Sequence, residues 1–346
     1  MVDNGSVDRS AELAKEAGAR VIHHSQKGYG SALKRGIRDA HGRYIIMGDG
    51  DDTYDFSDLR SLIDPLRNGA DLVMGSRLRG QIEPGAMPWL HRWIGTPALT
   101  FLLNLFFKMK VSDVNCGFRG FKKETIEKLD LKCDGMEFAS EMLIKAAQKK
   151  LAIKETPVNL YAPPPGRRSH LHSFKDGWRH LRFMLIFCPK YLFLLPGLSL
   201  FALGLFFTAL LHFKTIYLFG MPMGISSAVF ASALLFVGMQ VTLFGVFSIV
   251  LNSSKGLIEG GRIESFFKKY FTLERGLFFG TALLVLGMCL FLGTMIRIFY
   301  VANNLPYVDV SLTRFAIFSI SIVLLGVQLI FSSFYVSLFN LAETLK

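Results

Sequence analysis

Two carboxylates, one residue apart, follow a short apolar segment in the N-terminal part of the chain. Tyr44-Ile45-Ile46-Met47 is apolar and β-forming, and Asp49-Gly50-Asp51-Asp52 comes shortly after it. Carboxylates in this spacing at the end of a strand supply the hard oxygen ligands that Mg²⁺ or Mn²⁺ takes beside phosphate oxygens. The spacing predicts Asp49 and Asp51 as metal ligands. The alternative is a plain turn, because Asp-Gly is a common turn dipeptide.

The cysteines add no second metal-binding pattern. Cys116, Cys133, Cys188 and Cys289 are scattered along the chain. Their separations do not match the spacing of metal ligands, so we expect four ordinary thiols.

Helix and strand patterns alternate in the N-terminal half, and these elements must position the carboxylates. The sequence predicts helices over 11–16, 31–40 and 57–67, the last with Ser57 as its N-cap, and strands over 20–24, 43–47 and 71–75. Strands that alternate with helices predict a parallel α/β sheet. Ligands of such sheets bind beyond the carboxyl ends of the strands. Asp49 and Asp51 follow one such end, and Ser76-Arg77 follows another.

The C-terminal half has the composition of a membrane protein. Of the 346 residues, 51% are hydrophobic and 32 are Phe. The stretches 192–212, 226–251, 277–302 and 313–340 each reach the roughly 20 residues that a spanning helix needs. We therefore predict an α/β domain over 1–165, a basic loop and juxtamembrane helix over 166–191, and an all-α membrane domain over 192–346 with four spans.

Basic residues are distributed unevenly among the connections between the predicted spans. The run before the first span is basic, and so is the second connection, which includes Lys268, Lys269 and Arg275, whereas the first connection offers only Lys214. The positive-inside rule places the α/β domain, the second connection and the C-terminus in the cytoplasm. The net charge of +12 fits a lipid bilayer as partner. No recognition motif or zinc spacing supports nucleic acid as a partner.

Residues 173–191, just before the first span, have an amphipathic pattern. One helix face carries Phe174, Trp178, Leu181, Leu185 and Cys188, and another carries Lys175, Arg179 and Arg182. This pattern predicts a helix that lies in the head-group layer of the membrane. The alternative is a solvated helix that packs on its own domain.

Five motifs occur in the order and spacing of a known family. They are Val2-Asp3-Asn4-Gly5-Ser6-Val7-Asp8, Asp49-Gly50-Asp51, Gly75-Ser76-Arg77, Asp113-Val114-Asn115-Cys116-Gly117-Phe118-Arg119 and Glu137-Phe138-Ala139-Ser140-Glu141. Over residues 2–190 the chain resembles the family 2 glycosyltransferases of GT-A fold, specifically the polyprenyl-phosphate glycosyltransferases related to dolichol-phosphate mannose synthase. The resemblance implies inverting transfer of a hexose from a nucleotide-diphosphate sugar to undecaprenyl or dolichyl phosphate at the cytoplasmic membrane face.

The resemblance also implies roles on the donor side. Asp49 and Asp51 would hold Mg²⁺ or Mn²⁺ with the diphosphate, which makes Asp51 a catalytic residue as well as a ligand. Asp3 would contact the nucleobase or the ribose. The simpler alternative for Asp3 is a turn beside Asn4-Gly5.

Four further residues would contact the rest of the donor. Glu137 and Glu141 would bind sugar hydroxyls, and Arg167 and Arg168 would close over the diphosphate. The alternatives are a salt bridge from Glu141 to Lys145 and simple attraction of the two arginines to anionic lipid.

A polyprenyl phosphate needs cations and hydrogen-bond donors more than a strong base, because the second pKa of a phosphomonoester is about 6. Arg77, Arg92 and Thr96 match family positions that hold this phosphate, and Arg92 and Thr96 share a face if 88–109 is helical. Arg92 also fits a snorkelling arginine at the membrane interface. By the resemblance Asp113 is catalytic, either orienting the sugar or assisting as a base. Its alternative is a helix cap.

The chain departs from the family pattern at its start. Family members begin with an apolar strand and a Pro-x-x-Asn-Glu turn before the point that corresponds to Met1. We expect the chain as written to lack this first strand and to bind nucleotide poorly. Equal binding by an N-terminally extended version would contradict this expectation.

Two other functions remain open at this point. A processive polysaccharide synthase also joins a GT-A domain to a membrane region, but its Gln-x-x-Arg-Trp motif would need Gln where Trp89 precedes Arg92-Trp93. The second alternative is a catalytically silent scaffold or lipid-binding protein with a decayed transferase domain. A homo-oligomer is compatible with each of the three functions.

Overall fold

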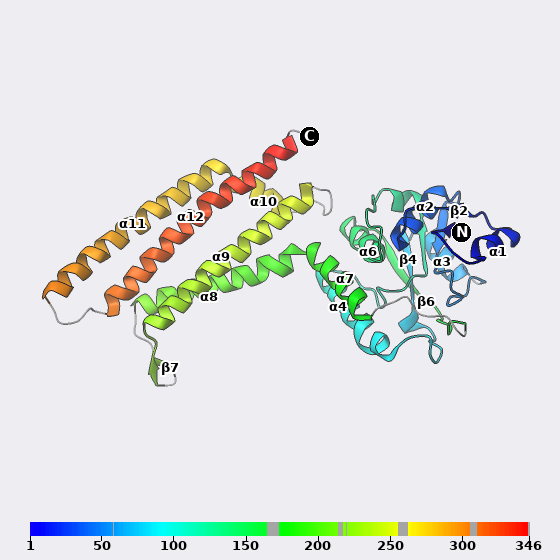
Figure 1. Cartoon of the computed structure of the whole chain (residues 1–346), viewed down its shortest axis with the longest axis horizontal. Helices are drawn as coiled ribbons and strands as arrows, with labels where there is room; N and C mark the ends of the chain where they lie inside the picture. Colours follow the sequence, from blue (N-terminus) through cyan, green and yellow to red (C-terminus); the bar gives the residue numbers. More distant parts are fainter. Residues whose placement is uncertain are drawn as a thin grey trace. The chain divides into compact units, whose positions relative to one another are not determined.

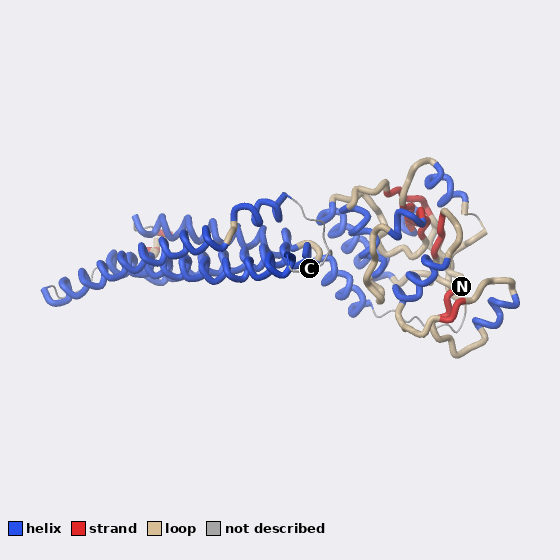
Figure 2. The backbone as a smooth tube through the Cα atoms, turned by 90° about the horizontal axis from the view of Figure 1, so that it is seen from above, coloured by secondary structure: helices blue, strands red, loops and turns tan. Residues whose placement is uncertain are grey.

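The protein consists of two compact units, Met1–Leu185 and Ile186–Lys346. The computed structural model describes residues 1–57, 59–164, 173–213, 217–218, 220–254, 262–304 and 310–344. The first unit mixes strands with short helices, and the second consists mainly of long helices (Figures 1 and 2). The expected order of an α/β domain followed by an all-α membrane region is confirmed.

The first unit follows the predicted alternation and adds elements to it. Its strands are β1 (Val2–Asp3), β2 (Ile22–His23), β3 (Tyr44–Met47), β4 (Leu72–Ser76), β5 (Arg119–Lys122) and β6 (Ile153–Pro157). Its α-helices are α1 (Ser10–Glu16), α2 (Tyr29–Asp39), α3 (Arg60–Arg67), α4 (Thr96–Phe107), α5 (Lys123–Glu127), α6 (Phe138–Gln148) and α7 (Ser173–Ile186), whose last residue enters the second unit. Two single turns, the 3₁₀ segment η1 (Arg77–Arg79) and the π segment η2 (His91–Gly95), complete it.

The main sheet is mixed rather than parallel. Its strand order is β3-β5-β4-β6, with β5 antiparallel to β3 and to β4, and β6 parallel to β4. The sequence-based expectation of a parallel sheet missed β5, which inserts between β3 and β4. Because both neighbours oppose β5, they run in the same direction, and their carboxyl ends lie at one edge. Strands β1 and β2 pair in parallel with each other as a separate sheet, next to the N-terminus in Figure 2.

Helix α3 covers the sheet through its buried face. Leu62 and Leu66 are fully or almost fully buried, and a methyl group added at Gly120 of β5 would lie 3.3 Å from each of them. The helix therefore approaches the strand where the strand has no side chain. Burial of two leucines stabilises this contact by roughly 2–5 kcal/mol each, judged from Leu→Ala replacements in cores.

Two helix starts differ from the sequence-based expectations. Helix α3 begins at Arg60, with Leu59 as its N-cap and without a capping side chain, because Ser57 is held in a turn by its N–H bond to Asp55 Oδ1 at 2.7 Å. The helix expected over 88–109 contains the π turn η2 before α4 begins at Thr96. The π turn changes the angle between residues four apart.

The described part of α7 buries one face and leaves another exposed. Met184 is completely buried and His180 Nδ1 lies 2.9 Å from Ser140 Oγ on α6, whereas Trp178 is 58% exposed. Arg179 and Arg182 are exposed too. The helix therefore packs on its own unit along one face, as in the alternative interpretation, and leaves Trp178 with the arginines on its open side.

The second unit contains four helices that are long and apolar enough to cross a membrane. The four spans are Lys190–His212, Ile225–Ser254, Leu273–Val301 and Val310–Leu338. The first combines the π segment η3 (Lys190–Leu194) with α8 (Leu195–Phe213). The other three lie in α9 (Ile225–Ser254), α11 (Leu273–Asn304) and α12 (Val310–Thr344), respectively. The short strands β7 (Tyr217–Leu218) and β8 (Met221–Pro222) and the helix α10 (Arg262–Tyr270) lie between them. Gly204 and Gly238 let α8 and α9 approach closely, since a methyl group on either would lie 2.2 Å from the facing backbone.

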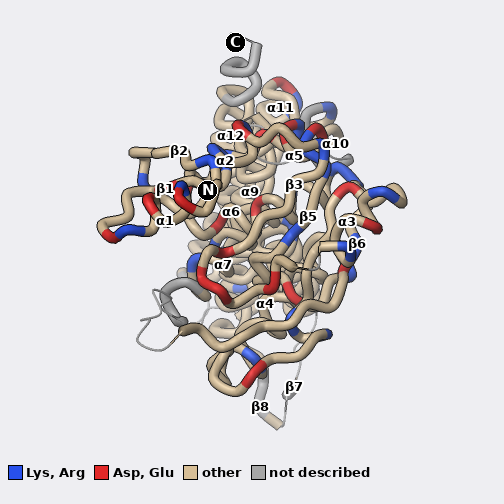
Figure 3. Tube along the Cα trace, turned by 90° about the vertical axis from the view of Figure 1, so that its right-hand side faces the viewer, with Lys and Arg blue, Asp and Glu red and all other residues tan. Residues whose placement is uncertain are grey.

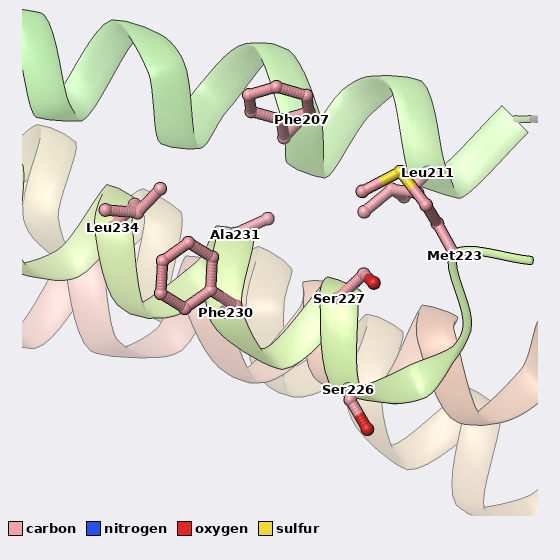
Figure 4. A pocket seen from close by; sticks show the side chains of 8 residues that line it. All are labelled: Phe207, Leu211, Met223, Ser226, Ser227, Phe230, Ala231 and Leu234. Atoms are coloured by element: carbon pink, nitrogen blue, oxygen red, sulfur yellow. The ribbon is translucent and has the colours of Figure 1, made fainter. Parts of the chain in front are cut away.

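An apolar groove of about 330 Å³ lies between α8 and α9 (Figure 4). Phe207 and Leu211 of α8 face Phe230, Ala231 and Leu234 of α9 across it. None of its lining side chains is titratable, so we assign it no chemistry. In the first unit, Lys and Arg residues alternate along the backbone with Asp and Glu residues, as Figure 3 shows.

Candidate functional site

The predicted metal ligands lie in the turn that follows β3. Asp49 is half-buried; this burial raises the pKa of its carboxyl group, and repulsion from Asp51 raises it further. A hydrogen bond from Tyr29 only partly opposes this effect on the pKa. The turn then passes through Asp52 in a left-handed conformation, with φ of 62°. Ionisation of Asp49 therefore costs extra free energy, and a bound cation would offset that cost.

Neighbouring residues fix both carboxylates. Asp51 Oδ1 accepts a bond from the Thr53 N–H at 3.3 Å and another from the Thr53 hydroxyl. Gly117 lies against Asp49, since a methyl group added at that glycine would be 2.6 Å from Asp49 Oδ2. Tyr54, after the turn, stacks on Phe118 with ring centroids 5.3 Å apart. The turn is thus anchored in the core.

The donor set fits a hard divalent cation. No cluster of three His, Cys, Asp or Glu ligands occurs among the described residues. Mg²⁺ is commonly held by one or two carboxylates with substrate phosphates and water completing its shell. Asp49 and Asp51 can provide the carboxylates of such a shell, and none of the cysteines is needed. Burial raises the pKa of the Cys116 thiol to about 11, as expected of an ordinary thiol.

Arg77, directly after β4, forms a two-bond ion pair with Asp113. Arg77 Nε and Nη2 donate to the two carboxylate oxygens at 2.7 and 2.8 Å, and the Arg77 N–H adds a third bond at 3.1 Å. Asp113 is completely buried and the Arg77 side chain is 14% exposed. Burial would lower the pKa of Arg77, but the bonds and the charge of Asp113 outweigh it and the pKa rises.

Asp113 is therefore already engaged on both oxygens. Its Oδ1 also accepts a bond from the Asn115 N–H at 3.2 Å, and its own N–H donates to Glu155 Oε1 of β6. This network holds Arg77 at the sheet edge that also carries Asp49. In this arrangement Asp113 anchors Arg77 through both of its carboxylate oxygens.

The other two predicted acceptor residues differ in burial. Thr96 is 3% exposed, and its hydroxyl accepts a bond from Asn115 Nδ2 at 3.4 Å. Arg92 is exposed and lies over the ring of Trp93, 5.4 Å from its centroid. The structure therefore buries Thr96 and leaves Arg92 exposed.

The two predicted sugar-binding glutamates occupy different environments. Glu141 is completely buried; it accepts bonds from the N–H groups of Lys132 and Cys133 and pairs with Lys145 at 2.8 Å. The geometry thus matches the structural alternative for Glu141. Glu137 is half-buried at the start of α6.

Asp3 is an ionised carboxylate at the end of β1. Bonds from Ser6, and then from His23 at 3.0 Å, lower the pKa of Asp3 to about 2. These contacts match the turn predicted beside Asn4. Arg167 and Arg168 lie outside the described residues.

Comparison with known proteins identifies the family. Residues 1–130 match the family Glycosyl transferase family 2, and residues 246–340 match the Glycosyltransferase family 2 C-terminal transmembrane region. The chain is 39% identical over 337 residues to the low-salt glycan biosynthesis hexosyltransferase Agl6 of Haloferax volcanii, covering 96% of this chain and 79% of that protein. The chain belongs to glycosyltransferase family 2. It is a membrane glycosyltransferase, which excludes the silent-scaffold alternative.

Other relatives match about half of this glycosyltransferase. The dolichyl-phosphate hexose transferase of Haloferax volcanii is 30% identical over 155 residues, 45% of this chain and 66% of that protein. The crystal structure of glucosyl-3-phosphoglycerate synthase from Mycobacterium tuberculosis with phosphoglyceric acid is 20% identical, covers 54% of this chain and 67% of its own, and has a TM-score of 0.41.

Two residues of the glycosyltransferase site were not singled out from the sequence. Tyr29 follows Gly28 at the start of α2 and bonds to Asp49, and burial, then the charge of Asp49, raise the pKa of its hydroxyl. Arg119 was part of a motif but had no assigned role, and it is completely buried. The two glycines that flank Tyr29 at the start of α2 are the one local signal in the sequence that could have indicated it.

Proposed function

We propose that this glycosyltransferase transfers a hexose, with inversion, from a nucleotide-diphosphate sugar to a polyprenyl phosphate at the cytoplasmic face of the membrane. The observation that carries the proposal is the shared sheet edge at which the carboxylates after β3 and the anchored Arg77 after β4 both lie, in a chain with four candidate spans. That edge offers ligands for a metal-bound diphosphate and a fixed cation for a second phosphate.

On the donor side, Asp49 and Asp51 would hold Mg²⁺ or Mn²⁺ against the diphosphate. When bound, the cation offsets charge that develops on the departing nucleoside diphosphate. The raised pKa of Asp49 supports this role, because a carboxylate destabilised by burial and by Asp51 gains most from a cation. Asp3 and Glu137 are proposed contacts of the nucleoside and the sugar, as is Glu141 in spite of its internal bonds, with Arg167 and Arg168 near the diphosphate.

On the acceptor side, the phosphate is its own nucleophile. A phosphomonoester with a second pKa of about 6 is largely ionised at neutral pH, so no strong base has to deprotonate it. The engagement of both Asp113 oxygens by Arg77 is compatible with such a reaction. Arg77 would orient the phosphate for direct displacement, which inverts the anomeric carbon. Arg92 and Thr96 are proposed to assist.

The names of two relatives support hexose transfer, and the first of them also supports the acceptor class. One is named a dolichyl-phosphate hexose transferase and another a hexosyltransferase of glycan biosynthesis. The orientation rests on the basic second connection, and the exposed Trp178 with its neighbouring arginines on α7 is consistent with an interfacial position. A polyprenyl tail would keep the acceptor phosphate at the same depth.

The proposal is tested by incubating the membrane-embedded protein with polyprenyl phosphate, Mn²⁺ and a panel of labelled nucleotide sugars. We expect label in the organic phase that resists mild base and is released by mild acid, as a lipid-phosphate sugar would be. Asp51→Asn should abolish this label while leaving membrane insertion intact. Absence of organic-phase label with every donor would refute the function, and full activity of Asp51→Asn would remove Asp51 from the metal site.

A further inference from the structure

Arg119, at the start of β5, joins two separate backbone segments through three carbonyl groups. Its Nε donates to the Cys116 carbonyl at 2.9 Å and its Nη2 to the Val114 carbonyl at 3.0 Å. Its Nη1 donates to the Ala139 carbonyl, in the first turn of α6, at 2.7 Å. A single planar guanidinium thus ties the segment 114–117 to α6.

The segment that Arg119 shapes touches the metal turn. Arg119 is paired in the sheet with Met47 at the end of β3 and with Met74 near the end of β4, so it begins β5 at the edge that carries Asp49 and Arg77. Gly117, two residues before it, lies against Asp49. Asp113, the anchor of Arg77, lies at the other end of the same segment. A change in the path of 114–117 would therefore displace the carboxylates of Asp49 and Asp113.

The charge of Arg119 is buried without an adjacent counter-charge. Its side chain is 0% exposed, and among the described residues no Asp or Glu lies within ion-pair distance of it; its oxygen acceptors are the three carbonyls. Buried arginines are usually paired with a carboxylate, and an arginine keeps its charge in proteins. A permanent cation behind the metal edge makes the local potential more positive and favours an anionic ligand there.

We propose that Arg119 is a positioning residue of the donor site, which sets the path of 114–117 against Asp49 and whose buried charge favours binding of the donor diphosphate. The inference rests on the proposed function, because it takes a nucleotide-diphosphate sugar as the donor. Only the first part, the path of 114–117, requires arginine. Lysine keeps the charge, but its ammonium group cannot make the three hydrogen bonds that the planar guanidinium donates to the three carbonyl groups.

The two parts are separated by two variants. Arg119→Lys keeps the charge and alters the fork, whereas Arg119→Met removes both. Lys122→Gln is the matched control, because it removes a cation from the other end of β5, where Lys122 pairs with Asp71 at 2.9 Å. Binding of uridine diphosphate and guanosine diphosphate to the full chain in detergent micelles, with Mn²⁺, is measured by calorimetry, and kcat and KM for the donor are measured in the transfer assay.

We expect Arg119→Met to weaken diphosphate binding on the order of tenfold, equivalent to about 1.4 kcal/mol. Arg119→Lys should keep that affinity within a few-fold but lower kcat about tenfold or more, because a misplaced carboxylate impairs the chemical step rather than binding. Lys122→Gln should change neither quantity.

Three results would overturn the inference. The first is unchanged diphosphate affinity in folded Arg119→Met, and the second is unchanged kcat in folded Arg119→Lys. The third is loss of folding in both variants, which would leave Arg119 a structural role only. Failure of the proposed function is distinguished from these results, since the unmodified chain would then transfer no sugar from any nucleotide-diphosphate donor.

Discussion

Asp49 combines burial with a neighbouring like charge, an arrangement that costs free energy until a cation neutralises it. The Asp-x-Asp spacing was visible in the sequence, but its environment was not. The contacts with Tyr29 and Gly117 come from residues far apart in the chain. The ion pair of Arg77 with Asp113, 36 residues away, was equally invisible. Sequence motifs therefore pointed to candidate residues, while their pairing depended on tertiary structure.

The raised pKa of Asp49 makes metal binding dependent on pH. Between the ordinary Asp pKa of about 3.9 and the raised value, the folded metal-free protein binds more protons than the unfolded chain, so its stability falls as pH rises. Mn²⁺ requires the ionised carboxylate and competes with that proton. We expect the increase in Tm on adding Mn²⁺ to be small at the acidic end of this window and to grow with pH, as measured by thermal melts in micelles.

Two variants check this expectation. Asp49→Asn should lose the Mn²⁺-dependent increase in Tm at every pH, whereas Asp64→Asn, an exposed carboxylate on α3, should keep it. An increase in Tm that is equal in both variants would contradict the assignment of Asp49 as a ligand.

Asp113→Asn should destabilise the first unit strongly. The change leaves the buried Arg77 charge without its carboxylate, and breaking such a pair typically costs about 3–5 kcal/mol. We expect Tm to fall by roughly 5–15 °C in micelles. Arg79→Gln is the control, since Arg79 is 55% exposed and lies 3.8 Å from Glu155, so its loss should cost less than about 1 kcal/mol. Equal effects of the two changes would contradict the role of Asp113 as anchor.

At the scale of elements, strand β5 determines the site. It lies between β3 and β4 and is antiparallel to both, so the carboxyl ends of β3 and β4 lie at one edge of the sheet. The sequence predicted the apolar strands β3 and β4 but not Arg119–Lys122 or Ile153–Pro157, because neither has an apolar run or a clear alternation. These segments become strands through pairing. Local pattern alone could not supply that information, and the expected parallel sheet failed for this reason.

Gly117→Ala tests the close approach of this segment to the metal turn. The added methyl group would lie 2.6 Å from Asp49 Oδ2, so Asp49 or the segment must shift. We expect sugar transfer to fall about tenfold or more while the protein remains folded. Gly177→Ala on α7 is the matched control, because nothing lies within 4 Å of its added methyl group and activity should be retained. Full activity of Gly117→Ala would show that the contact is unimportant.

At the scale of the whole molecule, the sequence predicted both the α/β character of the first unit and the four long apolar helices of the second. Hydropathy sufficed for the spans, because 18-residue windows of the four helices have mean hydropathies of 2.1 to 2.3. The packing between the spans was not predictable, since it depends on close approaches such as Gly204 and Gly238. Association of several copies remains a prediction.

The proposed orientation is tested with single added cysteines. Tyr217 and Tyr270 are 66% and 49% exposed and lie on opposite sides of α9 in the sequence. We expect Tyr217→Cys to react with a membrane-impermeant maleimide in intact cells, and Tyr270→Cys to react only after permeabilisation. The unmodified protein, with its four native cysteines, provides the background. The reverse labelling pattern would place the first unit outside the cell.

The nature of the acceptor is the central claim, and one comparison tests it most directly. The purified full chain is reconstituted in lipid nanodiscs with Mn²⁺ and a labelled nucleotide sugar, and either polyprenyl phosphate or the matching polyprenol is added. If the acceptor phosphate is the nucleophile, labelled lipid forms only with the phosphate, and chelation of Mn²⁺ abolishes it. Labelled lipid that forms equally well on the alcohol would contradict the account.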